Sequence, residues 1–193
     1  MVNSRVNIHR IINYLVIAGV MAMVLFPSVR TSVMSTLQRG LLGTGLMDAE
    51  PEITEPLGTV DRSLALETWD GTPLNSATTV GKPIFLHFWA SWCPPCVAEL
   101  PDVHRLIRAM PEEEVVFLLV TTEDDIDREK QFLRKNDYTD LPVYRIAGAL
   151  PASLSHRVIP TTYVISPSGK IVYRHEGLAQ YNHEAFKEFL RSL

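Results

Sequence analysis

The sequence has very little cysteine, and this excludes one large class of small secreted proteins. Cys93 and Cys96 are the only two cysteines among its 193 residues. Two cysteines cannot build the disulfide framework that holds such domains together. A bridge between them would close a loop so short that it constrains the unfolded chain very little. A purely structural disulfide is therefore a poor explanation for the pair.

The sequence also lacks a concentration of positive charge. Residues 50–193 carry 14 Lys and Arg against 21 Asp and Glu, a net charge of −7, and the basic residues are scattered. Nucleic-acid binding requires a basic face. We therefore expect no nucleic-acid partner.

Charge is missing altogether from one long segment near the N-terminus. After a short basic N-terminus (residues 1–10), residues 11–29 read "IINYLVIAGVMAMVLFPSV" without a charged side chain. A helix of this length spans about 28 Å, close to the hydrocarbon thickness of a bilayer. The rival interpretation is a cleaved signal peptide, but its apolar run is usually about 7–15 residues and ends in a small-x-small cleavage site. We expect an uncleaved transmembrane anchor or signal anchor over residues 11–29.

Two further segments follow this anchor. Residues 30–60 are rich in Ser, Thr and Gly, then in acidic residues and proline, which predicts a flexible tether. Residues 61–193 suffice for one domain, since domains usually run about 100–150 residues. Arg30 and Arg39 follow the apolar run, so the positive-inside rule does not fix the orientation of the anchor.

The pattern of apolar residues predicts an α/β domain. The nearly continuous apolar runs at 84–90 and 115–120 are typical of strands buried on both faces. Helical spacing follows each of them. A third strand "PVYRI", a hairpin joined by "PSGK" and a helix from about Asn182 complete the order. We predict a mixed central sheet with helices on both faces.

The two cysteines lie where the first buried strand gives way to a helix. Pro94 and Pro95 are acceptable there because the first N–H groups of a helix have no intrahelical partner. The helix N-terminus favours an anion, and therefore a thiolate at Cys93, the attacking species in disulfide exchange. Cys96 lies nearly one turn further along and can reach Cys93. The spacing therefore indicates a redox pair, with Cys93 as the exposed nucleophile and Cys96 as the buried resolving thiol.

A metal site is the alternative for two neighbouring thiols. A tetrahedral site needs three or four ligands, whereas the sequence offers two thiols and six dispersed histidines. We therefore predict no metal ligands and no cofactor apart from the redox-active disulfide Cys93–Cys96.

The stretch "FWASWCPPCVAELPDVHRL", followed by "VIPTTYVISPSGKIVYRHEG", resembles the membrane-anchored, extracytoplasmic thioredoxin-like proteins of the TlpA/ResA type, which include the thioredoxins of cytochrome c maturation. The resemblance covers about residues 57–193. It implies a thioredoxin-like fold and thiol–disulfide exchange with protein substrates. It also implies that Pro160 is cis and lies beside the cysteines, and that the backbone of Ile159 pairs with a substrate segment. By the same resemblance, Trp92 covers the cysteines and contacts the substrate.

Two ionisable residues near the motif each have two interpretations. Glu99 matches an acidic residue that is linked to thiol proton transfer in the ResA-like branch, but it is equally a solvated acid stabilised near a helix N-terminus. His87 departs from the family pattern. It is either a buried neutral histidine satisfied by hydrogen bonds or a proton relay for Cys96. The sequence leaves both choices open.

Together these features predict an extracytoplasmic thiol–disulfide oxidoreductase. It would be a single-pass protein of the inner or cytoplasmic membrane with its catalytic domain in the periplasm or outside the cell. The resemblance implies that it reduces disulfides in protein clients such as apocytochrome c, and that a membrane electron donor of the DsbD/CcdA type recharges it. Two alternatives are a protein that binds Cu(I) or maintains the thiols of a copper site, and a non-catalytic tethered adaptor.

Overall fold

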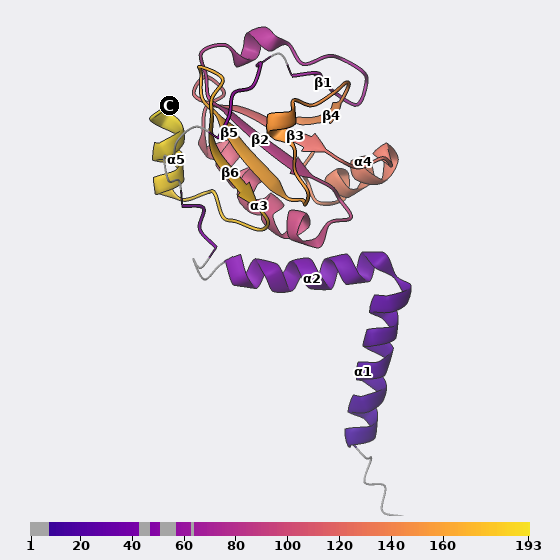
Figure 1. Ribbon diagram of the computed structural model, residues 1–193. Coiled ribbons are helices and arrows are strands. Elements are labelled where there is room, and N and C mark those ends of the chain that lie inside the picture. The colour runs from indigo at the N-terminus through magenta and orange to yellow at the C-terminus, as the bar shows by residue number, and fades with distance from the viewer. Residues whose placement is uncertain (1–7, 43–46, 51–56, 63) are drawn as a thin grey trace, which may run out of the picture.

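The computed structural model describes residues 8–42, 47–50, 57–62 and 64–193 (Figure 1). In chain order its elements are α1 (Ile8–Leu25), α2 (Pro27–Leu42), β1 (Leu66–Glu67), η1 (Ser76–Thr79), β2 (Ile84–Trp89), α3 (Pro94–Ala109), β3 (Val116–Thr121), α4 (Ile126–Lys135), β4 (Val143–Ile146), η2 (Ala152–Leu154), β5 (Thr161–Ile165), β6 (Ile171–Glu176) and α5 (Glu184–Arg191). The η elements are short 3₁₀ helices.

One sheet organises the domain, with the strand order β1-β4-β3-β2-β5-β6. At its centre, β2 pairs in parallel with β3 and antiparallel with β5. β4 continues the parallel half, and the β5–β6 hairpin continues the antiparallel half. Every residue of β2 is buried, which explains why its sequence is apolar without alternation. The predicted mixed sheet is confirmed.

The side chains of β2 alternate between two apolar clusters. Phe85 and Trp89 belong to the cluster that α3, α4 and α5 cover. Ile84, Leu86 and Phe88 belong to the cluster on the opposite face of the sheet. This alternation follows from the two-residue period of a strand. It places the end of β2 directly beneath the start of α3.

The second face of the sheet has less helical cover than the sequence pattern predicted. Its cluster is closed by Leu154 of the 3₁₀ helix η2 and by Val60 and Leu64 from the irregular segment before β1. The α-helices of the domain, α3 to α5, all contribute to the first cluster. The second face therefore combines a short helical turn with extended chain.

The first part of the predicted tether, residues 30–42, belongs to a helix. α2 packs against α3, so residues 30–42 are part of an ordered arrangement. Pro27 favours the first position of a helix and disfavours helical geometry at Phe26, which explains why α1 ends just before it. Thr31 and Thr36 donate their hydroxyls to carbonyls one turn back. Such bonds let a Ser- and Thr-rich segment remain helical.

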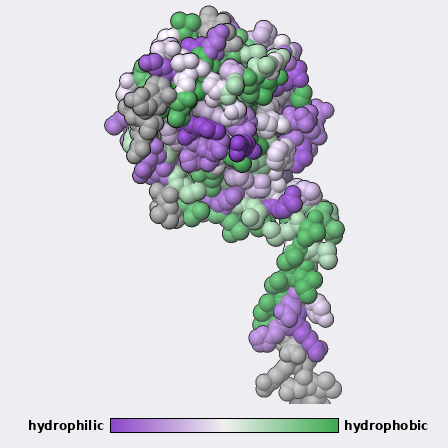
Figure 2. Space-filling view, viewed as in Figure 1, coloured by the Kyte–Doolittle hydropathy of each residue, from purple (hydrophilic) through white to green (hydrophobic). Residues whose placement is uncertain are grey.

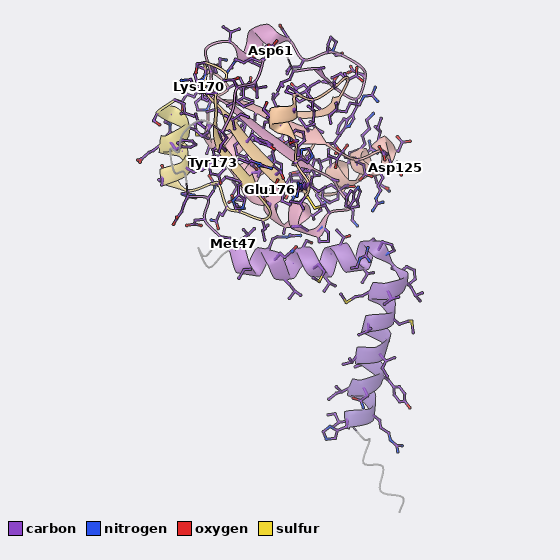
Figure 3. All side chains as sticks on the ribbon, in the orientation of Figure 1. Met47, Asp61, Asp125, Lys170, Tyr173 and Glu176 are labelled. Carbon is purple, nitrogen blue, oxygen red and sulfur yellow. A yellow bond between two sulfur atoms is a disulfide. The ribbon has the colours of Figure 1, made fainter. Side chains whose placement is uncertain are left out.

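The domain also begins earlier than residue 61. The N–H of Ala49 donates to the carbonyl of Gln180, and the N–H of Gln180 donates to the carbonyl of Met47, both at 2.8 Å. Figure 3 shows Met47 between the end of α2 and the domain. Residues 1–7 of the predicted basic N-terminus, and residues 43–46 and 51–56 of the predicted tether, lie outside the described residues.

A buried carboxyl on α4 titrates in an unusual range. Glu129 is fully buried, and one of its oxygens accepts a hydrogen bond from the indole N–H of Trp69 at 3.2 Å. Burial raises the pKa of Glu129 to about 7, although the bonds from Thr121 and Trp69 act in the opposite direction. The native state therefore holds a proton that the unfolded chain releases at lower pH.

We expect Glu129→Gln to alter the pH dependence of stability. The contribution of Glu129 to the free energy of unfolding falls as pH rises from about 4.5 to about 7, because its folded-state pKa lies above the unfolded value. The variant should lose this fall in the free energy of unfolding, which amounts to about 3 kcal/mol. Urea denaturation of the oxidised protein at several pH values measures it. Glu113→Gln, at an exposed carboxyl, is the control and should keep the native dependence.

Candidate active site

Cys93 caps the N-terminus of α3, immediately after β2 and the short turn that follows it. Its backbone is extended and its carbonyl accepts the first helical bond, from Val97 N–H at 3.0 Å. Cys93 and Cys96 are joined by a disulfide, with their Cα atoms 5.3 Å apart. The predicted redox pair is therefore present at the predicted junction of strand and helix.

The two prolines between the cysteines select which N–H group faces the sulfur. Pro94 and Pro95 have no N–H, so the first available donor of the helix is that of Cys96. This N–H points at Cys93 Sγ, 3.3 Å away. Such a donor, together with the positive end of the helix, stabilises negative charge on Cys93 once the disulfide is reduced.

A second loop approaches the cysteines from the far side of β2. The Ile159–Pro160 peptide bond is cis, as the resemblance implied. The carbonyl oxygen of Ile159 lies 3.6 Å from Cys93 Sγ. Pro160 is buried and Ile159 is half-buried, so the loop presents the Ile159 backbone beside the sulfur.

The two cysteines are less exposed to solvent than the sequence suggested. Cys93 is only 3 % exposed and Cys96 is fully buried, so the expected exposed nucleophile is largely covered in the disulfide form. Trp92 is 45 % exposed directly beside the pair. Ser91 donates to the Glu123 carboxylate at 2.7 Å and thereby ties this loop to the segment after β3. Ser91 and Glu123 were not singled out by the sequence pattern.

Glu99 on α3 and His87 on β2 lie side by side, and both are fully buried. Glu99 is therefore not the solvated acid of the simpler interpretation. Burial raises the pKa of Glu99 well above its usual range, and burial lowers the pKa of His87 to about 3. His87 Nδ1 lies 3.8 Å from Glu99 Oε1, beyond hydrogen-bond distance. Burial therefore opposes an ion pair between the two groups.

Hydroxyl groups complete the surroundings of His87. Its Nδ1 lies 2.9 Å from the hydroxyl of Thr162, which also accepts a bond from the hydroxyl of Tyr181 at 2.8 Å. His87 is thus a buried neutral histidine with a hydrogen bond, and its role as a relay stays a prediction. Thr162 lies in β5 and Tyr181 in the loop before α5, both far from His87 in the sequence, which explains why the pattern gave no sign of their contact.

Two acidic residues of α3 hold the loop before α5 against the site. Glu99 Oε2 accepts the N–H of Ala179 at 3.2 Å. Asp102 Oδ2 accepts the N–H groups of Tyr181 and Asn182, at 2.6 and 3.0 Å. Asp102 lies one turn after Glu99 in a helix that the sequence predicted, but its long-range partners cannot be read from spacing. Glu99 therefore has a structural partner as well as a place near the thiols.

Within the described part of the chain, no three His, Cys, Asp or Glu side chains are grouped as metal ligands would be. The candidate site is therefore the disulfide, the cis-proline loop and the buried pair Glu99 and His87.

Comparisons with known proteins agree with this geometry. Residues 47–188 match the family described as Redoxin. Sporulation thiol-disulfide oxidoreductase A of Bacillus subtilis (strain 168) is 31 % identical over 109 residues, which cover 55 % of this chain and 66 % of that protein. Thiol-disulfide oxidoreductase ResA of Halalkalibacterium halodurans is 28 % identical over 143 residues, which cover 68 % of this chain and 81 % of that protein. The chain thus spans just under two thirds of the first of these relatives.

A solved structure shows the same fold. The crystal structure of the pneumococcal exposed lipoprotein thioredoxin (Etrx1) from Streptococcus pneumoniae strain TIGR4 is similar, with a TM-score of 0.52 and 28 % sequence identity. The match covers 64 % of this chain and 94 % of that one. The predicted thioredoxin-like fold is thereby confirmed.

We expect His87→Asn to remove an acid-dependent loss of stability. The folded-state pKa of His87 lies below its unfolded value. Between these two pKa values the unfolded chain binds a proton at this residue and the native state does not. The contribution of His87 to the free energy of unfolding therefore falls as pH drops from about 6.5 to about 3. Denaturation of the oxidised protein across this range measures it. His175→Asn, at a partly exposed histidine, should keep the native slope; the same flattening in both variants would contradict the assignment to His87.

Proposed function

The chain belongs to the redoxin family, and we propose that it is a membrane-anchored thiol–disulfide oxidoreductase that reduces disulfides in protein clients. The observation that carries the proposal is the Cys93–Cys96 disulfide at the N-terminus of α3, with the cis-proline loop 3.6 Å from Cys93 Sγ. Relatives named thiol-disulfide oxidoreductases support it.

The first step uses Cys93. In the reduced protein the Cys93 thiolate, stabilised by the Cys96 N–H and the helix end, attacks one sulfur of a client disulfide. A new sulfur–sulfur bond joins Cys93 to the client, and the other client sulfur leaves with the electron pair and takes up a proton. The Ile159 backbone beside Cys93 is suited to pair with the client segment in an extended conformation. The half-exposed Trp92 offers that segment an apolar contact.

The second step uses Cys96. Its thiol loses a proton, and the thiolate attacks Cys93 Sγ, which forms the internal disulfide and releases the second client sulfur as a thiol. Two electrons have then passed from the cysteine pair to the client. Cys96 is buried, so its proton needs a nearby acceptor. Glu99 lies three residues further along α3 on the same side, and its raised pKa brings the carboxylate closer to a thiol in proton affinity.

The spent disulfide must then be reduced by another protein, because the chain contains no third cysteine. A membrane electron donor of the DsbD/CcdA type fits this need, and apocytochrome c is the proposed client. α1 supports a location at the inner or cytoplasmic membrane, with the domain in the periplasm or outside the cell. By length and composition α1 can cross a membrane, and none of its residues is buried.

We expect Cys96→Ala to accumulate mixed disulfides between Cys93 and its clients in cells. Without the resolving thiol the first step still proceeds, whereas the second cannot. Acid trapping followed by non-reducing electrophoresis and mass spectrometry identifies the partners. Cys93→Ser is the matched control and should trap none. If the Cys96→Ala protein carries no client in reducing and oxidising strains alike, the proposed direction of electron flow is wrong.

We expect Glu99→Gln to slow the second step by about 10²-fold, the usual contribution of one proton acceptor. In the native protein the rate should rise as pH rises through the raised pKa of Glu99, because only the ionised carboxylate accepts a proton. The variant should lose this rise. The measurement is the release of a reporter thiol from a preformed mixed disulfide at Cys93.

Asp102→Asn makes the same chemical change one turn along α3, where the carboxylate also holds loop N–H groups. If Asp102→Asn flattens the pH profile as strongly as Glu99→Gln does, the effect comes from the loop rather than from proton transfer.

A further inference from the structure

The helix α2 turns a mostly polar side towards the domain, which is unusual for a helix on the surface of a protein surrounded by water. A surface helix normally turns its apolar side inward and its polar side to solvent. The buried residues of α2 are Ser35 and Leu42, and Thr31 and Gln38 on the same side are partly buried. This inward side is therefore mostly polar.

A polar cavity of about 390 Å³ lies between α2 and the domain. Its walls on the α2 side carry hydroxyl groups and the Arg39 guanidinium, and its walls on the domain side include Arg128, Lys135 and Ser91, with Val97 and Phe132 as apolar members. Such a lining is well suited to water. The contact between α2 and the domain therefore does not bury most of the apolar side chains of α2. Their position needs a separate explanation.

Those apolar side chains occupy the opposite side of the helix and one of its flanks. Val29, Val33, Leu37 and Leu41 recur every four residues, and all are exposed, Leu37 by 66 %. Met34 adjoins them and is exposed as well. We call these five residues the outer face of α2. An apolar face directed away from the protein indicates an apolar medium on that side.

The position of α1 shows which medium this is. Figure 1 shows α2 lying along the underside of the domain, while α1 leaves one end of it and points away from the domain. The chain bends between α1 and α2, at a point that we call the elbow, because Pro27 cannot continue α1. In Figure 2 the hydrophobic surface of α1 continues onto the adjoining part of the molecule at the elbow. A bilayer crossed by α1 would thus meet the outer face of α2 at its surface.

We propose that α2 is an interfacial helix whose outer face binds the lipid surface of the membrane that α1 crosses. This inference rests on the proposed membrane anchor. An interfacial helix lies in the plane of the membrane with its apolar side about 5–10 Å into the boundary of headgroups and acyl chains. Arg30 lies between Leu37 and Leu41 around the helix, near the elbow, and its long side chain can extend to lipid phosphates.

The arrangement fixes the redox end of the domain near the bilayer. Met47 and Ala49 already bond to the loop before α5, so only four residues of sequence separate α2 from the domain. Ser91, two residues before Cys93, lines the same cavity as the inward side of α2. A helix bound to the surface therefore holds the Cys93 end close to the membrane, where a membrane electron donor operates.

The test uses the full chain in liposomes made with lipids brominated on their acyl chains, which quench nearby tryptophan. Leu37→Trp places the probe on the outer face. Ser32→Trp places it on the exposed flank that borders the polar cavity. After subtraction of the native tryptophan emission, we expect Leu37→Trp to lose roughly half of its emission and to be blue-shifted, as interfacial burial requires. Ser32→Trp should be quenched no more than the native protein.

Flotation of the same liposomes separates this inference from the anchor itself. If the protein floats and Leu37→Trp is not quenched beyond Ser32→Trp, the anchor stands and the interfacial helix is overturned. A blue shift without quenching means that another protein surface, such as a second copy of this chain, covers the outer face, and also overturns it. If the native protein does not float, the anchor and the interfacial helix both fail.

Discussion

The site depends on the junction between β2 and α3. β2 is buried on both faces, so its end is held rigidly, and Cys93 is fixed at the first turn of the helix that follows. The two prolines leave Cys96 as the first residue whose N–H can face Cys93 Sγ. One backbone donor, the helix end and the cis-proline loop thus converge on a single sulfur. Displacing β2 would misplace all three.

Around this junction the protein buries two ionisable side chains. Burial penalises the ionised forms of both Glu99 and His87. Glu99 is held by Ala179 N–H, and His87 by the hydroxyl of Thr162. A carboxyl kept in this way costs stability at neutral pH, and the same burial brings its proton affinity towards that of a thiol. Stability and chemistry are therefore set by one environment.

Much of this could be predicted from the sequence because it depends on local pattern. The buried strands, the junction of strand and helix, and the spacing of Cys93 and Cys96 all follow from residues close together in the chain. The contacts of Asp102 with the loop at 181–182 join residues about eighty apart, and no periodicity reveals them. α2 was missed for another reason. Its Ser and Thr residues suggest a linker, and only their hydroxyl bonds to the preceding turn show how they fit a helix.

The short link between α2 and Met47 has a consequence for how the domain finds its partners. A domain on a long free tether explores a volume, and its encounters with membrane proteins resemble those in solution. With α2 bound to the membrane as we propose, the chain holds the domain against a plane, so both its position and its orientation are restricted before any encounter begins. Partners in the same membrane then meet it by lateral diffusion at a raised effective concentration. Soluble clients, by contrast, can approach only from the side that faces away from the lipid.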